Sequence, residues 1–147
     1  MMAKCSSRVV LMLAVAVLSA GCGLFSDPQR MIAKAQEYRE KRDYKAAIIE
    51  LKNALQKDAT HAEARYLLGA THYDNRDYRL AEAELRRALE SRYERSKVMP
   101  ALARAMLMLG NFQKVLEQVP VEARMSNAVQ ADVLTLRARA GRAWAHG

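Results

Sequence analysis

A fixed interval of 34 residues runs through this chain. Tyr44, Tyr78 and Phe112 stand at this interval, and each follows a short polar segment that is typical of a turn. An interval near 34 is the period of a solenoid made of helix-turn-helix units. The sequence therefore predicts an all-α solenoid in which an aromatic residue fills the junction where each second helix begins.

The same interval holds in the columns that close helix packing requires. Small residues in one column predict a close approach of the two helices of a unit, and apolar residues in two more predict a buried face on the second helix. These columns are Ala35, Gly69 and Ala103; Ala47, Ala81 and Val115; and Leu51, Leu85 and Val119. An ordinary amphipathic helical bundle is the alternative, but it gives no reason for one register to persist across so many columns.

At these positions the chain resembles the tetratricopeptide-repeat (TPR) family. The matching residues are Met31, Ala35, Tyr38, Ala47, Leu51 and Ala54 in the first unit, Leu68, Gly69, Ala81, Leu85 and Ala88 in the second, and Leu102, Ala103, Phe112 and Val115 in the third. The second unit departs from the family pattern at Arg65 and His72, where bulky apolar or aromatic residues are usual. The third departs from it at Pro120, which falls inside its second helix.

The first 21 residues have the features of a secretory signal peptide. Lys4 and Arg8 precede an uncharged apolar run from Val9 to Ala20, which is shorter than the roughly 20 residues of a membrane-spanning helix. The segment Leu18-Ser19-Ala20-Gly21-Cys22 resembles the lipobox of bacterial lipoproteins, with serine where leucine is usual. This resemblance implies cleavage before Cys22 and a covalent lipid on Cys22.

The two cysteines allow a second interpretation, a disulfide between Cys5 and Cys22. Cleavage before Cys22 would remove Cys5, so the lipidated form leaves no such pair. Several acyl chains on one cysteine hold a protein durably at a membrane. Because Gly23 rather than aspartate follows Cys22, the resemblance implies the outer membrane of a Gram-negative bacterium, with the protein on its periplasmic face.

The charge of the chain is basic but finely mixed. It has 24 Lys and Arg against 16 Asp and Glu, a net charge of +8. Such an excess could favour nucleic acid, acidic polysaccharide or anionic lipid. The signs alternate along the expected helices, however, as in Arg39-Glu40-Lys41-Arg42, which is typical of solvated faces with local ion pairs. With a secretory signal besides, we expect no nucleic-acid partner.

The third unit is degenerate at its end. Because Pro120 cannot donate a helical hydrogen bond and restricts the residue before it, the second helix should end near Gln118. The run Val129, Val133, Leu136 and Ala140 predicts a further first helix, whose pattern is lost from Gly141 onward. With no second helix to follow, we expect the beginning of a longer array. The predicted organisation is a signal peptide at 1–21, a lipidated tether at 22–28, TPR units at 29–61, 62–95 and 96–122, and a partial fourth unit at 127–147.

A closer resemblance covers most of the chain after the lipobox. The segments Ala33–Tyr38, Tyr44–Asp58 and Ala62–Gly69 are similar to the N-terminal region of the PEP-CTERM system TPR-repeat lipoproteins. That family consists of longer repeat arrays that accompany exosortase protein sorting and exopolysaccharide production in Gram-negative bacteria. The resemblance implies no catalytic residues.

The sequence also offers no catalytic or metal-binding pattern. His61, His72 and His146 are isolated, and no His, Cys and Glu share a helical face at a spacing that suits a metal. We expect each histidine to be hydrogen-bonded or solvent-facing, and paired carboxylates such as Glu82 and Glu84 to lie on exposed faces or helix ends. No serine elbow or phosphate loop is present. The sequence thus predicts a protein that is not an enzyme, with no cofactor, metal or small-molecule substrate.

Function is then expected from the groove that stacked units create. In TPR arrays the first helices line this concave surface, where protein or peptide partners bind. Tyrosine and arginine often anchor such interfaces. Nine residues are nominated on this basis: Gln36, Arg39, Glu40, Tyr66, Tyr73, Asp74, Arg104, Leu107 and Met108.

The leading hypothesis is a lipid-anchored scaffold for protein partners in exosortase-linked protein sorting or exopolysaccharide production. One alternative keeps the fold but assigns the chain to type IV pilus or outer-membrane protein assembly. Another is an inert truncated fragment.

Overall fold

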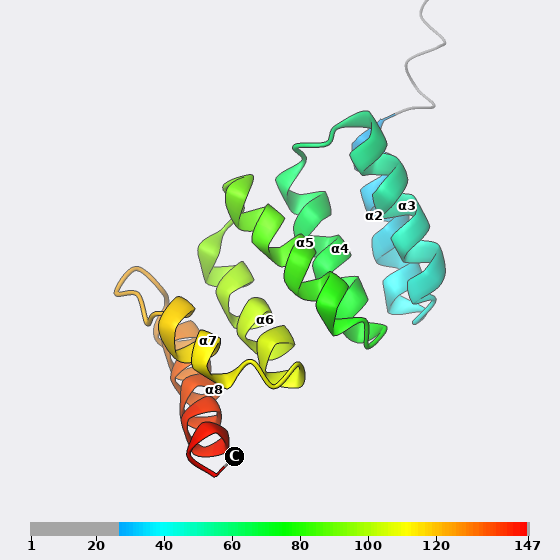
Figure 1. The fold of residues 1–147 in the computed structure, drawn as a ribbon. Coiled ribbons are helices and arrows are strands. Elements are labelled where there is room, and N and C mark those ends of the chain that lie inside the picture. The colour runs from blue at the N-terminus through cyan, green and yellow to red at the C-terminus, as the bar shows by residue number, and fades with distance from the viewer. Residues whose placement is uncertain (1–26, 147) are drawn as a thin grey trace, which may run out of the picture.

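The computed structural model describes residues 27–146, and these residues form seven helices and no strand. The helices follow one another as antiparallel neighbours from the blue to the red end of the chain (Figure 1). They are α2 (Pro28–Glu40), α3 (Tyr44–Lys57), α4 (Ala62–Asp74), α5 (Tyr78–Glu90), α6 (Arg95–Met108), α7 (Phe112–Gln118) and α8 (Asn127–Ala145). The predicted all-α solenoid is confirmed.

The helices pack most extensively in the pairs α2 with α3 and α4 with α5, and each pair then contacts the next through its second helix. Two apolar cores result. One lies among α2, α3 and α4 around Leu51, and the other extends from α5 to α8 around Leu85 and Met106. Tyr66 of α4 packs against both cores and so joins them.

The turn inside each helix pair repeats with the interval of 34. Arg42, Arg76 and Gly110 have positive φ angles of 59°, 66° and 73°. After each of them the next amide closes the end of the first helix, and the three hydrogen bonds are Asp43 N to Tyr38 O at 2.9 Å, Asp77 N to His72 O at 2.8 Å and Asn111 N to Met106 O at 2.9 Å. This is a Schellman arrangement, which glycine suits best because a side chain strains the left-handed conformation.

The small residues lie where two helices meet, as predicted. Ala35 and Ala103 are fully buried. A Cβ atom added to Gly69 would stand 2.7 Å from Cγ of Leu85, closer than packed atoms come. Gly69 therefore sets the distance between α4 and α5, because any larger residue would force Leu85 aside.

The first described helix begins at a proline. Pro28 opens α2, and the Asp27 side chain accepts a hydrogen bond from the Gln29 amide at 2.9 Å. Proline is favoured at this position because its missing amide proton would have no helical partner. The predicted signal peptide, Cys22 and all of the tether before Asp27 lie outside the described residues.

The second helix of the third pair is short, as Pro120 predicts. α7 ends at Gln118 after seven residues, and its last carbonyl groups would lack partners. Arg137 of α8 supplies them, because its Nη1 donates to Leu116 O at 2.6 Å and to Val119 O at 2.8 Å. A side chain from the next helix thus closes the end that proline interrupts.

α8 is longer than its sequence pattern indicates. We expected the helical pattern to stop at Gly141, but the helix continues to Ala145. Val133, Leu136 and Ala140 are its buried residues, and they lie on α6 and α7 together. Because α7 is short, α8 reaches α6 far more extensively than α6 reaches α4.

Candidate functional site

The first helices carry a shallow cavity where the sequence placed the start of the groove. Gln36, Arg39 and Glu40 of α2 line it together with Leu67 of α4, and its volume is about 350 Å³. Three of the nine nominated residues therefore meet at one hollow. Three polar side chains and the apolar Leu67 line it together, and a peptide segment can use both kinds of surface.

An ion pair fixes one wall of this cavity. Arg39 Nη2 lies 3.0 Å from Asp74 Oδ2, which joins the end of α2 to the end of α4. Both side chains are partly exposed, so the pair adds little stability, but it holds the guanidinium in one place. Arg39 Nε is buried without a hydrogen-bond partner. The nominated Arg39 and Asp74 are therefore brought together, and they bind each other.

The two nominated tyrosines serve packing. The Tyr66 ring stacks on Tyr93 with centroids 4.9 Å apart, and the Tyr73 ring lies 5.5 Å from that of Tyr78 in a tilted arrangement. All four rings are partly buried against the larger core or its neighbours. Such aromatic pairs stabilise by about 0.5–1.5 kcal/mol beyond burial. One ring surface of Tyr66 and one of Tyr73 is thus occupied within the fold.

The remaining nominated residues lie on α6, apart from the cavity. Arg104 forms an ion pair with Asp132 of α8, which repeats the first-helix bridge between α2 and α4. Leu107 is partly buried, and Met108 is 52% exposed. The nine residues therefore form a cavity at one end of the first-helix face and a separate set at the other, with tyrosines between them.

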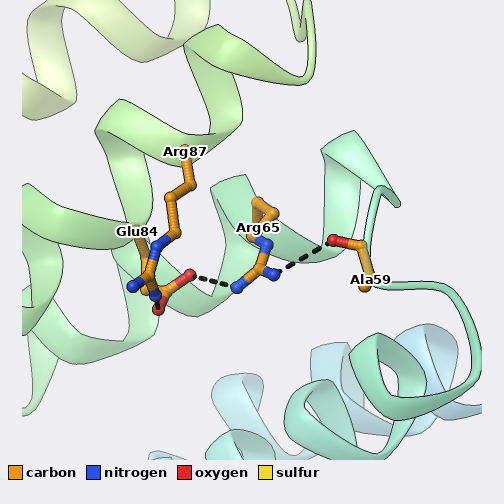
Figure 2. A network of polar contacts seen from close by, with 4 residues as sticks. All are labelled: Ala59, Arg65, Glu84 and Arg87. Carbon is orange, nitrogen blue, oxygen red and sulfur yellow. Dashed lines mark hydrogen bonds and ion pairs between the residues drawn. The ribbon is translucent and has the colours of Figure 1, made fainter.

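Sequence reasoning missed a buried ion network between α4 and α5. Glu84 was expected on an exposed face, but it is only 8% exposed. Figure 2 shows its carboxylate held between two arginines: Arg65 Nη1 donates at 2.9 Å and Arg87 Nη1 at 2.5 Å. Arg65 also donates to Ala59 O at 3.0 Å. The departure of Arg65 from the TPR pattern is the signal that could have indicated a partner of opposite charge.

His72, the second departure, is buried rather than solvent-facing. It is 4% exposed, and its Nδ1 has no hydrogen bond, although the Asp77 carboxylate lies 3.5 Å away. Burial lowers the pKa of His72, and Asp77 opposes this shift only in part. The expectation of a hydrogen-bonded or exposed ring is therefore wrong for His72. His61 instead caps α4, because its Nδ1 accepts from the Ala64 amide at 3.3 Å.

Within residues 27–146, no group of three or more His, Cys, Asp or Glu residues is placed to hold a metal ion. The helices of the same range are too short or too polar to cross a membrane.

Residues 38–99 match the family model described as tetratricopeptide repeat. The match begins in the last turns of α2 and ends in α6, so it includes the two helices α4 and α5 that pack most extensively. No curated protein matches the chain. An all-helical fold of this kind is typically a scaffold for protein interactions rather than a catalyst. The consecutive packed pairs form an all-α solenoid, and the matched segment within it is similar to tetratricopeptide repeats.

Proposed function

We propose that this protein is a lipid-anchored, non-catalytic scaffold that binds protein partners on its first-helix face. The observation that carries the binding part is the cavity of about 350 Å³ where Gln36, Glu40 and the ion-paired Arg39 surround Leu67. The amide of Gln36, the carboxylate of Glu40 and the apolar side chain of Leu67 suit a peptide segment better than a small substrate. Lipid attachment rests on the sequence around Cys22.

The partners are proposed to be components of an exosortase-linked sorting or exopolysaccharide system on the periplasmic side of the outer membrane. This assignment rests on the resemblance of Ala33–Tyr38, Tyr44–Asp58 and Ala62–Gly69 to the PEP-CTERM lipoproteins. The alternative partners are subunits of type IV pilus or outer-membrane protein assembly. An inert fragment would have no partner at all.

Capture of partners from native membranes separates these possibilities. The variant Gln36→Lys/Glu40→Lys should lose the partners that the unaltered chain recovers, because it fills the cavity with like charge beside Arg39. Gln56→Lys/Glu90→Lys is the matched control, since it makes the same substitutions on exposed positions of α3 and α5. Equal loss in both variants, or no partner for the unaltered chain, would contradict the binding proposal. Recovery of secretin or barrel-assembly subunits would favour the alternative.

The anchor has an independent test. Cys22→Ser should release the protein from washed membranes into the soluble fraction, because the lipid has no other attachment site in the proposal. Cys5→Ser is the control and should leave membrane association unchanged. Continued association of the Cys22 variant would contradict lipidation.

A further inference from the structure

One edge of the solenoid carries a charge that its own residues do not balance. We name it the turn edge: the turns at 41–45, 75–80 and 109–114 and the end of α8 at 142–146. Figure 1 shows these three turns and the C-terminal end of α8 along the same lower edge. The chain enters α2 at the opposite edge, which holds the turns at 57–62, 90–95 and 119–126.

The two edges differ in net charge. The opposite edge has four Lys or Arg and four Asp or Glu, so it is neutral. The turn edge has seven cations and two carboxylates. The seven are Lys41, Arg42, Lys45, Arg76, Arg79, Lys114 and Arg142, all of them exposed.

The two carboxylates of the turn edge are already engaged. Asp43 accepts from the Ala46 amide at 3.1 Å, and Asp77 accepts from Asn75 Nδ2 at 2.6 Å. None of the seven cations forms an ion pair with another described residue, whereas Arg95 of the opposite edge binds Glu122. With seven cations against two carboxylates, the turn edge therefore presents a net positive charge, and its cations are free to meet an acidic partner.

Two hollows recur along this edge at the interval of 34. The first has a volume of about 320 Å³ and lies over residues 76–80, closed by Leu109. The second, of about 280 Å³, lies over residues 110–114 and is closed by Trp144 of α8. Leu80 in the first is 50% exposed, and Trp144 in the second is 60% exposed. Each hollow thus offers apolar surface beside an unpaired cation, Arg79 in one and Lys114 in the other.

We infer that the turn edge docks an acidic segment of a partner protein that places two large apolar side chains in these hollows. The two hollows lie one helix pair apart, and side chains an even number of residues apart face the same side of an extended segment, so apolar side chains four residues apart can enter both hollows. Carboxylates between and beside those side chains would meet the unpaired cations. This surface rests on the proposed scaffold function and adds the chemistry of a second contact.

A membrane surface is the competing occupant, because exposed tryptophan and cations also suit anionic lipid. The geometry favours the peptide. The two hollows are separate, and each can receive a large apolar side chain, which a flat headgroup layer does not supply. The proposed anchor precedes α2 in the sequence, and α2 begins at the edge opposite to the turn edge.

Trp144 is the only tryptophan of the chain, so its fluorescence reports on the second hollow directly. The probe is the peptide Glu-Glu-Phe-Glu-Glu-Glu-Phe-Glu-Glu, titrated into the full chain. Saturable change of the Trp144 emission is expected, together with weaker binding as salt rises. The same peptide with glutamine in place of every glutamate should bind at least about tenfold more weakly.

Charge reversal locates the contact. Arg79→Glu/Lys114→Glu should weaken binding of the acidic peptide about tenfold, and both changes place an acid near a helix N-terminus, where it is tolerated. Lys57→Glu/Arg124→Glu is the matched control, with the same change in net charge on the opposite edge, and should bind within about twofold of the unaltered chain. A second check uses the full chain in phosphatidylglycerol vesicles with brominated acyl chains, where Trp144 should not be quenched.

Absence of binding to the acidic peptide, equal binding of the glutamine peptide or equal loss in both variants would overturn the inference. So would quenching by the brominated lipid, which would assign the edge to a membrane. Each of these leaves the scaffold proposal standing as long as partner capture still depends on Gln36 and Glu40. Conversely, peptide docking can hold while the cavity variants capture partners normally, so the two failures are distinguishable.

Discussion

The first two helix pairs and the last three helices bury their apolar faces in different ways. From α2 to α5, helices of similar length pair closely through small residues such as Gly69, and polar contacts add to that packing. From α6 to α8, the second helix is half as long, and α8 covers α6 and α7 together. The comparison shows that a repeat with a shortened second helix can be stabilised by the helix that follows it rather than by its own residues.

Arg137 of α8 makes this stabilising contact, and its position in the repeat is informative. The interval of 34 places it with Ala35, Gly69 and Ala103, the small residues that admit a second helix. At Gly69, a Cβ atom would collide with Leu85 of the adjacent helix. At the equivalent position of α8, the side chain of Arg137 would likewise collide with a closely packed helix unless it turned aside. It does turn aside, toward the carbonyl groups that α7 leaves open.

The largest effect is expected in the regular part. Glu84→Gln removes the charge between Arg65 and Arg87 and should cost about 2–3 kcal/mol in the free energy of unfolding, because Arg65 keeps a poorly solvated charge. Glu50→Gln changes the equivalent residue of the first pair, whose partner Lys34 is about half exposed. It should cost less than about 1 kcal/mol. Urea unfolding measures both, and equal costs would contradict the buried network.

The next effect sharpens the comparison at α7. Arg137→Met keeps the length of the side chain but removes two hydrogen bonds to carbonyl groups, and should cost about 2 kcal/mol. Amide exchange should rise in α7 and α8 while α2 and α3 stay protected. Arg139→Met is the control, because Arg139 lies on the same helix and is exposed, and its cost should stay under about 0.5 kcal/mol. Unchanged exchange in α7 would disprove the capping role.

A smaller effect, of opposite sign, comes from the turns. Arg76→Gly should raise stability by about 1 kcal/mol, since it relieves a positive φ of 66° while the hydrogen bonds of the turn remain. The third pair already has Gly110 in this column, so Gly110→Arg should cost a similar amount. Thermal unfolding compares the two variants. A loss of stability in Arg76→Gly would mean that the arginine side chain holds the turn.

The smallest effect at neutral pH concerns His72. Because its pKa is lowered in the folded state, the unfolded chain takes up a proton first as the pH falls. Stability should therefore be complete above pH of about 6.5 and decline as the pH falls through the lower folded pKa. His72→Met, the residue of the third pair in this column, should flatten that decline.

The control for this pH dependence is His61→Asn, which keeps a helix-capping side chain and should keep the decline. The pKa values of Asp58 and Asp77 are lowered from the ordinary 3.8, so these two groups change stability only at a pH below that value. Stability measured by urea at pH 7 and pH 5 is the readout. An equal decline in the His72 variant and the unaltered chain would remove His72 as the cause.

The interval of 34 was sufficient to predict the architecture, because it records contacts that every pair repeats. The apolar columns predicted the buried faces of the helices, and Pro120 predicted the end of α7. Both predictions succeeded because the apolar spacing and the proline act on the backbone within a few residues. The same register nominated Gln36, Arg39 and Glu40, which line one cavity, but their binding of a partner stays a prediction. These predictions needed no knowledge of which helices lie side by side.

The polar contacts could not be predicted in this way. Glu84, Arg137 and His72 take their surroundings from other helices, and a long side chain can reach several partners from one position. The length of α8 was missed because the apolar pattern ends at Gly141, whereas the helix continues to Ala145 through residues that are not buried. Pro100 lies buried inside α6, where tertiary contacts outweigh its local preference.

Hydrogen exchange on a variant that detaches α8 tests the account most directly. Leu136→Asp places a charge on the buried face of α8 and should remove it from α6 and α7. We predict that amides of α6 and α7 then exchange rapidly while those of α2, α3 and α4 remain protected. Protection of α7 that persists without α8, or loss of protection throughout the chain, would contradict a regular array whose damaged last pair is held by α8.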